Sequence, residues 1–351
     1  MNTPTAGASA AARVVKPLLL ALVACALLSG VLGGLLRAGL ALPAFDGQRW
    51  VGQALLSHAA LMIGGFLGTV IGIERAVAVR LPLAFVAPLA SGAGALCLLA
   101  GQPRAGHGLL LLAALVFTAV NVVIVRRQRA AHTGLLLVAA FAWLVGNGLA
   151  TLGDRSPATL SWWFAFLVLT IAAERLEMTR LMQRPQAVTL AFHGIVALLL
   201  LGAAAAGVSA AAGGLLYGAA LSLLALWLMA YDIARRTVHA EGLSRYMAIC
   251  LLGGYAWLLV AGVAWAAMAL GEPTRDMALH ALGLGFVLSM VMGHGPVILP
   301  AVARVKLLFG WPFYLPLALL HLTLLLRLGG GLIDDPLRAT GAAGNALAMA
   351  W

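Results

Sequence analysis

The feature that most constrains this chain is a series of apolar runs, each about 20 residues long, that recurs from one end of the sequence to the other. A helix of that length crosses the hydrocarbon core of a bilayer, which is about 30 Å thick. Inside lipid, only helices and closed barrels satisfy their own backbone donors and acceptors. Hydrophobic residues make up 63% of the sequence and charged residues only 9%, so a soluble core cannot account for the pattern. The sequence therefore predicts an all-α, polytopic transmembrane helical bundle.

The runs define eleven complete spans and part of a twelfth. We expect residues 1–16 to form a cytoplasmic N-terminal tail and residues 17–351 to form a single integral membrane domain. The first apolar run is long enough to remain as a helix, so no cleavable signal peptide is expected. The stretch RATGAAGNALAMAW at 338–351 resembles the start of a twelfth span that is truncated, since about fourteen residues cannot cross the bilayer core. The complete spans are predicted near 17–42, 50–73, 81–101, 107–125, 132–152, 159–179, 187–207, 209–233, 244–270, 276–301 and 311–329.

Basic residues outnumber acidic ones, with 22 Lys and Arg against 11 Asp and Glu, and they lie singly or in twos and threes at the ends of spans. Nucleic-acid binding requires basic residues clustered on one face, so this scatter excludes it. Loops on one side of the predicted bundle hold fifteen of the 22 basic residues, and the alternate loops hold the other seven. Cytoplasmic loops of membrane proteins are enriched in Lys and Arg, which places the N-terminus in the cytoplasm.

The second span begins with His58, in the segment HAALMIGGFLGTVIGIERAVAV. An α-helix turns about 100° per residue, so Gly65, Thr69 and Gly72 lie within about 40° of the direction of His58. Ionisable residues inside a membrane are costly and are therefore functional candidates. One reading is that this face of small residues receives a flat, bulky group beside the imidazole. The other is that the glycines serve close helix–helix packing and that His58 bonds to a neighbouring backbone.

The tenth span, HALGLGFVLSMVMGHGPVILP, carries His280 and His294 on one side but about 21 Å apart along the helix, with Gly283 on the same stripe. The second and tenth spans both run inward, so His58 and His280 are expected at matching depths near the outer leaflet. Two neutral imidazoles at one depth are what axial ligation of haem needs, and without a CxxCH motif the haem would be of the b type. Asp276, one turn before His280, is either a helix N-cap or an acceptor that orients the ring.

A second group of polar residues is predicted at the inner end of the bundle. It includes the end of the second span, the segment AAERLEMTRLM of the sixth span, and His294 beside a Gly-Pro break. A proline removes a backbone donor, so a freed carbonyl could join such a site. This group fits a second metal site, a proton relay or an internal ion-pair network. Its candidate residues are Glu74, Arg75, Glu174, Arg175, Glu177, His193 and His294.

Three of these segments resemble the NnrS family: HALGLGFVLSMVMGH in the tenth span, HAALMIGGFLGTVIG in the second and AAERLEMTRLM in the sixth. That family comprises helical membrane proteins described as containing haem and copper and associated with nitric oxide metabolism in bacteria. The resemblance implies a multi-pass protein of the bacterial inner membrane. It places His58, His280 and His294 at family-like positions and assigns no role to any of them.

This chain departs from the family pattern in the tenth span. Where the family continues Gly-His-Thr-Gly-Arg, the chain reads Gly293-His294-Gly295-Pro296-Val297 and loses the arginine, as in a divergent member. The positions of the second-span and tenth-span histidines also look like the low-spin haem site of haem-copper oxidases. The chain has neither HxH nor HH, so its histidines are too few and too scattered for oxygen-reductase chemistry.

The sequence therefore favours a haem-binding membrane protein of the NnrS type that handles nitric oxide or a related redox reaction. Its expected ligands are haem b held by His58 and His280, with His294 as a third candidate metal ligand that would hold copper. Its expected partners are the lipid bilayer, a small gaseous substrate and a redox partner protein of unknown identity, and an oxidoreductase activity would follow. The alternative is a proton-coupled transporter or channel that uses the intramembrane His and Glu residues.

Overall fold

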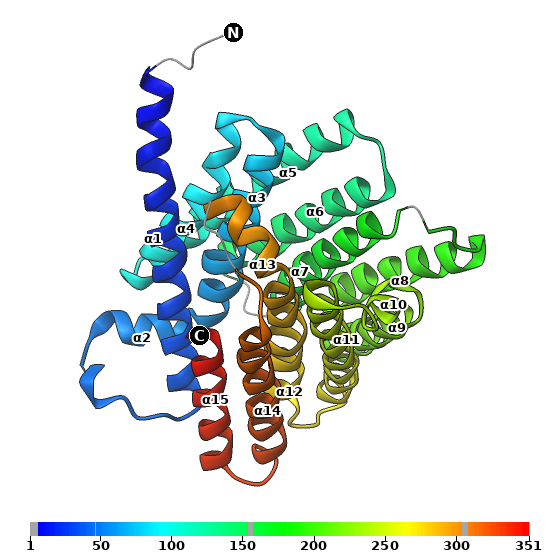
Figure 1. Ribbon diagram of the computed structural model, residues 1–351. Helices are drawn as coiled ribbons and strands as arrows, with labels where there is room; N and C mark the ends of the chain where they lie inside the picture. The colour runs from blue at the N-terminus through cyan, green and yellow to red at the C-terminus, as the bar shows by residue number, and fades with distance from the viewer. Residues whose placement is uncertain (1–5, 46, 154–156, 181, 304–307, 351) are drawn as a thin grey trace. The chain divides into compact units, whose positions relative to one another are not determined.

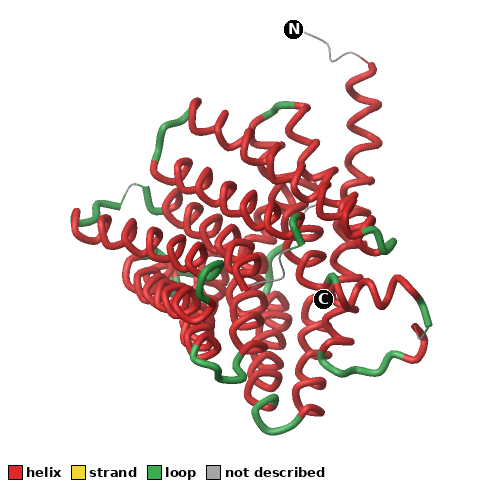
Figure 2. Tube along the Cα trace, turned by 180° about the vertical axis from the view of Figure 1, so that it is seen from behind, coloured by secondary structure: helices red, strands yellow, loops and turns green. Residues whose placement is uncertain are grey.

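The computed structural model describes residues 6–45, 47–153, 157–180, 182–303 and 308–350, which fold into helices joined by short loops (Figure 1). Within these ranges no β-strand occurs (Figure 2). Eleven of the described helices are long and apolar enough to cross a membrane, so the predicted all-α polytopic bundle is confirmed. They are Val15–Arg37, Ala60–Val79, Pro82–Leu99, Pro103–Arg127, Ala131–Thr151, Pro157–Met178, Gln186–Ala205, Ala210–Tyr231, Gly242–Ala269, Arg275–Val297 and Trp311–Gly330.

The contacts within the chain divide it into two compact units, and the first comprises Met1–Arg127 and Asn147–Gly153. In this unit α1 packs against η2, α2 and α4, and α4 pairs with α5. The segment η2 is a π-helix, in which each backbone hydrogen bond spans one residue more than in an α-helix. Its elements are α1 (Ala6–Arg37), η1 (Pro43–Phe45), α2 (Arg49–Leu56), η2 (Ala60–Gly68), α3 (Thr69–Val79), η3 (Pro82–Phe85), α4 (Val86–Leu99) and α5 (Pro103–Arg127).

The second unit comprises Gln128–Gly146 and Asp154–Trp351, and it therefore holds most of α6 (Ala131–Thr151). Here α11 packs against α9, η4, α12 and α13, while α14 pairs with α15. A Cβ atom at Gly218 of α9 would lie 2.6 Å from the carbonyl oxygen of Gly262 of α11, so the glycine lets these two backbones meet. The remaining elements are α7 (Pro157–Met178), α8 (Gln186–Ala205), α9 (Ala210–Tyr231), α10 (Ala234–Thr237), α11 (Gly242–Ala269), α12 (Arg275–His280), the π-helix η4 (Ala281–Leu288), α13 (Ser289–Ala303), η5 (Trp311–Phe313), α14 (Tyr314–Gly330) and α15 (Asp335–Ala350).

Several predicted boundaries are wrong by a turn or more. The first candidate span begins at Val15, close to the predicted start, but its helix α1 ends at Arg37 and not near residue 42. The second span does not end near residue 73, because its helix continues to Val79 and stops only where Arg80 takes a left-handed conformation (φ 57°) ahead of a Leu-Pro step. Glu74 and Arg75 therefore lie within a helix and not after its end. Residues 338–350 belong to α15, whose 16 residues pair with α14.

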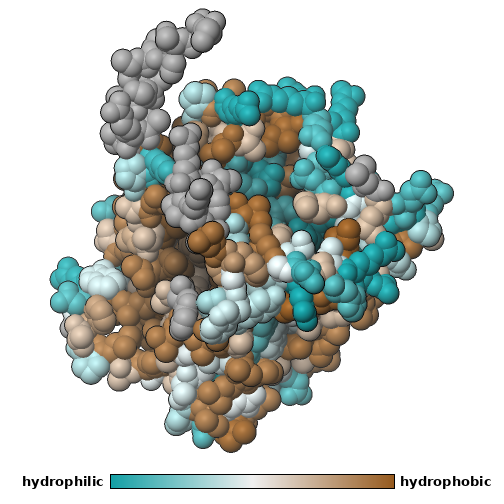
Figure 3. Space-filling view, viewed as in Figure 1, coloured by the Kyte–Doolittle hydropathy of each residue, from teal (hydrophilic) through white to brown (hydrophobic). Residues whose placement is uncertain are grey.

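The exposed side chains agree with a bilayer as the surroundings. Many large apolar residues are exposed on the outer faces of the spans, among them Leu28, Phe141, Leu201, Leu322 and Leu325. The face in Figure 3 is largely hydrophobic over α14 and α15, with hydrophilic residues gathered at helix ends and loops. In water such a surface would promote aggregation, whereas in lipid it is the ordinary covering of a membrane protein.

Candidate functional site

His58, the first histidine predicted to bind haem, lies between α2 and η2 in the first unit. Its Nδ1 atom is 2.7 Å from the carbonyl oxygen of Gly30 in α1. A carbonyl oxygen only accepts hydrogen bonds, so Nδ1 carries the proton and Nε2 bears the lone pair. A Cβ atom at Gly34 would lie 2.8 Å from the Cε1 atom of the ring, so glycine is needed there for the imidazole to rest on α1. The helix α1 thus fixes both the tautomer and the position of His58.

The small residues predicted to share a face with His58 pack against neighbouring helices of the first unit. A Cβ atom at Gly65 would meet Ala95 and Ala26, and one at Gly72 would meet Pro88. The hydroxyl of Thr69 donates to the backbone of its own helix at 2.6 Å. The prediction that these residues share a face with His58 assumed about 100° of rotation per residue, as in an α-helix. The wider turns of the π-helix η2 do not follow that value. This is the packing alternative, and a role of these residues in cofactor binding stays a prediction.

His280 belongs to a three-residue network in the second unit. Its Nδ1 atom is 2.9 Å from Oδ1 of Asp276, and the same carboxylate receives two hydrogen bonds from the guanidinium of Arg327, at 2.9 and 3.1 Å. The NH2 group of Arg327 also lies 3.1 Å from Nε2 and 3.2 Å from Nδ1 of the imidazole, so the guanidinium contacts the ring as well as the carboxylate. Asp276 thus orients the ring, and no side chain caps α12. Arg327 is nearly buried, with 7% of its side chain exposed.

His58 and His280 share a local design. Each has a proton on Nδ1 that is directed to an oxygen, and each lies one or two residues before a π-helical segment, η2 or η4. Such segments are rare and concentrate at functional sites. Within η4, a Cβ atom at Gly283 would lie 3.8 Å from the ring of Phe164, which is ordinary van der Waals contact. The likeness between HAALMIGGF and HALGLGF in the sequence therefore extends to the backbone.

His294 of α13 contacts Arg175 of α7, and both are residues predicted for the inner polar site. The Nδ1 atom is 2.6 Å from the carbonyl oxygen of Met290, and NH2 of Arg175 lies 2.9 Å from Nε2. A carbonyl oxygen only accepts hydrogen bonds, so the ring of His294 is a neutral Nδ1–H tautomer whose Nε2 accepts from Arg175. Arg175 is buried, with 4% exposed.

Asp232, just beyond α9, was missed by the sequence reasoning. It is 2% exposed, and burial raises the pKa of its carboxyl group, although the backbone N–H of Ala234, the nearby arginines Arg175 and Arg184 and the hydroxyl of Tyr255 lower it in part. The Nε atom of Arg175, Oδ2 of Asp232 and the hydroxyl of Tyr255 are buried, and none meets a partner at hydrogen-bonding distance and angle among the described residues. A buried group of polar atoms with unmet hydrogen bonds is a place for ordered water or a small polar ligand.

The remaining residues predicted for the inner site are Glu74, Arg75, Glu174, Glu177 and His193. Glu74 pairs with its neighbour Arg75 at 2.9 Å in the first unit. Glu177 lies 4.0 Å from Nε2 of His132. Glu174 is half-buried on α7, and His193 is exposed on α8.

Three more side chains escaped the sequence reasoning. Arg327 is one of the seven basic residues assigned to the alternate loops, although its place within the apolar run LALLHLTLLLRLGG indicates that it is buried. His321 has no partner in the sequence, but its Nδ1 atom accepts a 2.7 Å hydrogen bond from the indole of Trp257. Tyr255 lies in an apolar run, so nothing in the sequence points to it.

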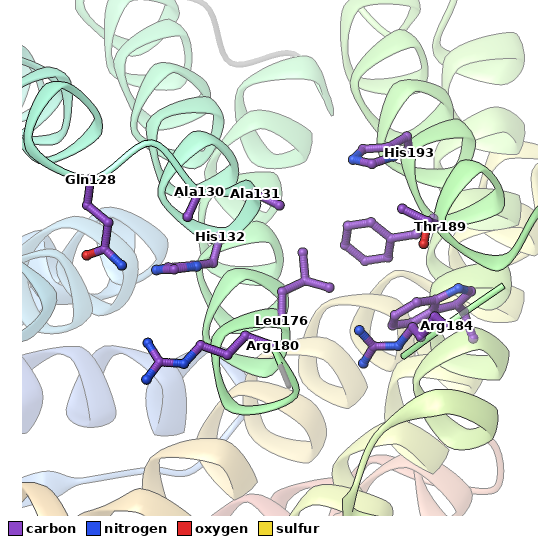
Figure 4. Close-up of a pocket in the computed structure, with 11 residues that line it drawn as sticks. Gln128, Ala130, Ala131, His132, Leu176, Arg180, Arg184, Thr189 and His193 are labelled. Atoms are coloured by element: carbon purple, nitrogen blue, oxygen red, sulfur yellow. The ribbon is translucent and has the colours of Figure 1, made fainter. Parts of the chain in front are cut away.

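A cavity of about 360 Å³ lies at the ends of α6, α7 and α8 in the second unit (Figure 4). Gln128, His132 and Arg180 lie on one side of it, and Arg184 and His193 lie on the other. Its lining residues are Gln128, Ala130, Ala131, His132, Leu176, Arg180, Arg184, Thr189, Phe192, His193 and Trp227.

A comparison with curated proteins finds no match, and a comparison with solved structures also finds none. The model of one protein family covers nearly the whole chain. Residues 13–351 match the family described as Domain of unknown function (DUF8744), and the chain belongs to that family.

Proposed function

We propose that the protein binds haem b through His58 and His280 and serves a redox reaction of nitric oxide or a related small molecule, in the manner of NnrS proteins of the bacterial inner membrane. The observation that carries the proposal is the shared local design of the two histidines. Metal-binding histidines typically donate one ring N–H to an oxygen, which fixes the tautomer and leaves the other nitrogen to the metal. The pairing of His58 with His280 rests on the prediction from the sequence that both lie at the same depth in the membrane.

The described residues fit haem in donor type. Bound haem would supply an iron atom that takes up one electron and binds small gases. The carbonyl of Gly30 would hold the ring of His58, and the carboxylate of Asp276 would hold that of His280. Ligation at His280 requires that Arg327 leave Nε2, and its second bond to Asp276, from Nε at 3.1 Å, can keep the guanidinium nearby.

The described residues do not fit copper at His294. Copper sites gather several histidine or sulfur ligands, yet no group of three or more His, Cys, Asp or Glu residues forms among the residues with described positions. In addition, Arg175 occupies Nε2. Copper therefore stays a prediction from the sequence.

Purified protein in detergent tests the haem proposal. After expression with a haem supply, the wild type should show a Soret absorption band, and His58→Ala and His280→Ala should each lose or shift it. His321→Ala is the matched control, because that intramembrane histidine already accepts from Trp257. A wild type that unfolds cooperatively but stays colourless after haem is added would refute the proposal.

A second candidate, a proton-coupled transporter, is favoured by the buried group at Arg175, Asp232, Tyr255 and His294. Water between their unmet donors and acceptors would give a path for protons. Proteoliposomes with a pH-sensitive dye inside measure proton entry under a pH gradient. Asp232→Asn should abolish an entry that the wild type shows, while Glu241→Gln, in a loop, should not. Equal leakage from liposomes with and without protein would exclude this candidate.

A further inference from the structure

We propose that the cavity in Figure 4 binds a phosphate group, independently of any haem. The polar side chains that line it are two guanidiniums, two imidazoles, an amide and a hydroxyl, and its lining contains neither Asp nor Glu. Such a cavity attracts anions. The guanidiniums belong to Arg180 and Arg184, and the imidazoles belong to His132 and His193.

The acidic residues nearest to the cavity do not cancel this charge. Glu177 lies 4.0 Å from His132 without lining the cavity, and it is 44% exposed. Asp232 does not line the cavity either, and burial lowers the pKa of Arg184 more than the charge of Asp232 raises it. Arginine keeps its proton at all physiological pH values, so a partly desolvated guanidinium gains most from an anion that contacts it directly.

Arg184 is held in place before any ligand arrives. Its NH2 group donates to the hydroxyl of Thr179 at 2.5 Å, and the guanidinium lies 5.2 Å from the centre of the Trp227 ring. The indole is in turn fixed by a 3.0 Å hydrogen bond to the carbonyl of Val188. Arg184 lines the cavity, so a ligand oxygen there meets a guanidinium that is already held in place, without the entropy cost of ordering a mobile arginine.

The size and place of the cavity indicate the rest of the ligand. Cavities that bind small organic molecules begin at about 300 Å³, so one of 360 Å³ admits a phosphate with a small organic group. Leu176, Phe192 and Trp227 supply an apolar wall for that group. The charge asymmetry of the loops places this end of the helices at the cytoplasmic face, where basic pockets between spans bind anionic headgroups. Two sources share this chemistry: the glycerol phosphate headgroup of an anionic lipid, and a free phosphate monoester.

Thermal unfolding in detergent tests the proposal by measuring the melting temperature with two probes, glycerol phosphate and short-chain phosphatidylglycerol. Phosphatidylcholine serves as the reference for both. Stabilisation by both probes indicates a soluble phosphate ligand, and stabilisation by the lipid alone indicates a headgroup; either outcome supports the site. Arg180→Gln and Arg184→Gln should each weaken binding about tenfold or more, the loss of one charge-assisted contact.

Arg129→Gln is the matched control, because Arg129 is exposed beside Gln128 but does not line the cavity. It should bind both probes as the wild type does. If Arg184→Gln does not fold, the exposed Arg180 carries the test alone. No stabilisation by either probe, or an equal loss of affinity in the control, would overturn the proposal.

Discussion

The Asp276–His280–Arg327 network gives the sharpest prediction about stability. The substitution Arg327→Met keeps the apolar stem of the side chain and removes the guanidinium, which makes four contacts with its two partners at 2.9 to 3.2 Å. It leaves the carboxylate of Asp276 and the Nε2 atom of His280 to find other partners. A stability loss is expected because the network links α12 to α14.

The size of the stability loss in Arg327→Met depends on how deeply the two partners are buried. Breaking a fully buried ion pair costs about 3–5 kcal/mol, whereas an exposed pair contributes about 0.2–1 kcal/mol. The guanidinium of Arg327 is 7% exposed, but the side chain of Asp276 is 36% exposed and can recover some hydration. We therefore expect a loss of about 2 kcal/mol, between these two limits. Adding Asp276→Asn should restore part of the loss, because a neutral amide no longer needs a cation.

The assay is equilibrium unfolding in mixed detergent, applied to the wild type, both single variants and the double variant. The coupling energy from this cycle should exceed about 1 kcal/mol, as for residues in one hydrogen-bonded network. Additive single effects would refute the reasoning. The same variant also bears on haem: because Arg327 competes for Nε2, Arg327→Met should bind haem at least as tightly as the wild type, and a lost Soret band would count against His280 as a ligand.

Three further substitutions have outcomes that follow from the structure. Gly34→Ala places a methyl group against the ring of His58 and should cost about 1–3 kcal/mol, whereas Gly52→Ala, which faces open space, should cost almost nothing in the same thermal unfolding assay. Gly218→Val should separate α9 from α11 and reduce the yield of folded protein in size-exclusion chromatography, and an unchanged elution profile would contradict the tight crossing. Asp232→Asn should flatten the pH dependence of stability. In the folded state Asp232 keeps its proton to a higher pH than in the unfolded chain. Wild-type stability should therefore fall as pH rises from about 4 through the raised pKa of Asp232. A wild-type melting temperature that does not change over this pH range would contradict the prediction.

The spans could be predicted from the sequence because hydrophobicity over about 20 residues is a strong signal. Their ends could not, since nothing local reveals that the helix after Arg75 continues to Val79 until a left-handed residue stops it. The predicted face below His58 rested on α-helical geometry, which the π-helix η2 does not follow.

The sequence could predict which residues belong to the candidate site better than it could predict which of them contact one another. Arg175 and His294 are both predicted for the inner site, and they do meet. The contact of Arg327 with Asp276, 51 positions earlier in the chain, depends on how α14 packs, and no spacing rule connects residues so distant. Asp232 shows the same limit, because its neighbours come from different segments of the chain.

Two arginines from neighbouring helices hold the tenth span in place. Arg327 of α14 contacts the α12–α13 segment at His280, and Arg175 of α7 contacts it fourteen residues later, at His294. Each guanidinium lies within hydrogen-bonding distance of the Nε2 atom of its imidazole, so a metal ion that binds this nitrogen has to displace the arginine. A ligand that binds His280 would therefore also release this segment from α14, and one that binds His294 would release it from α7. Ligand binding at either end would thus be coupled to movement of a helix.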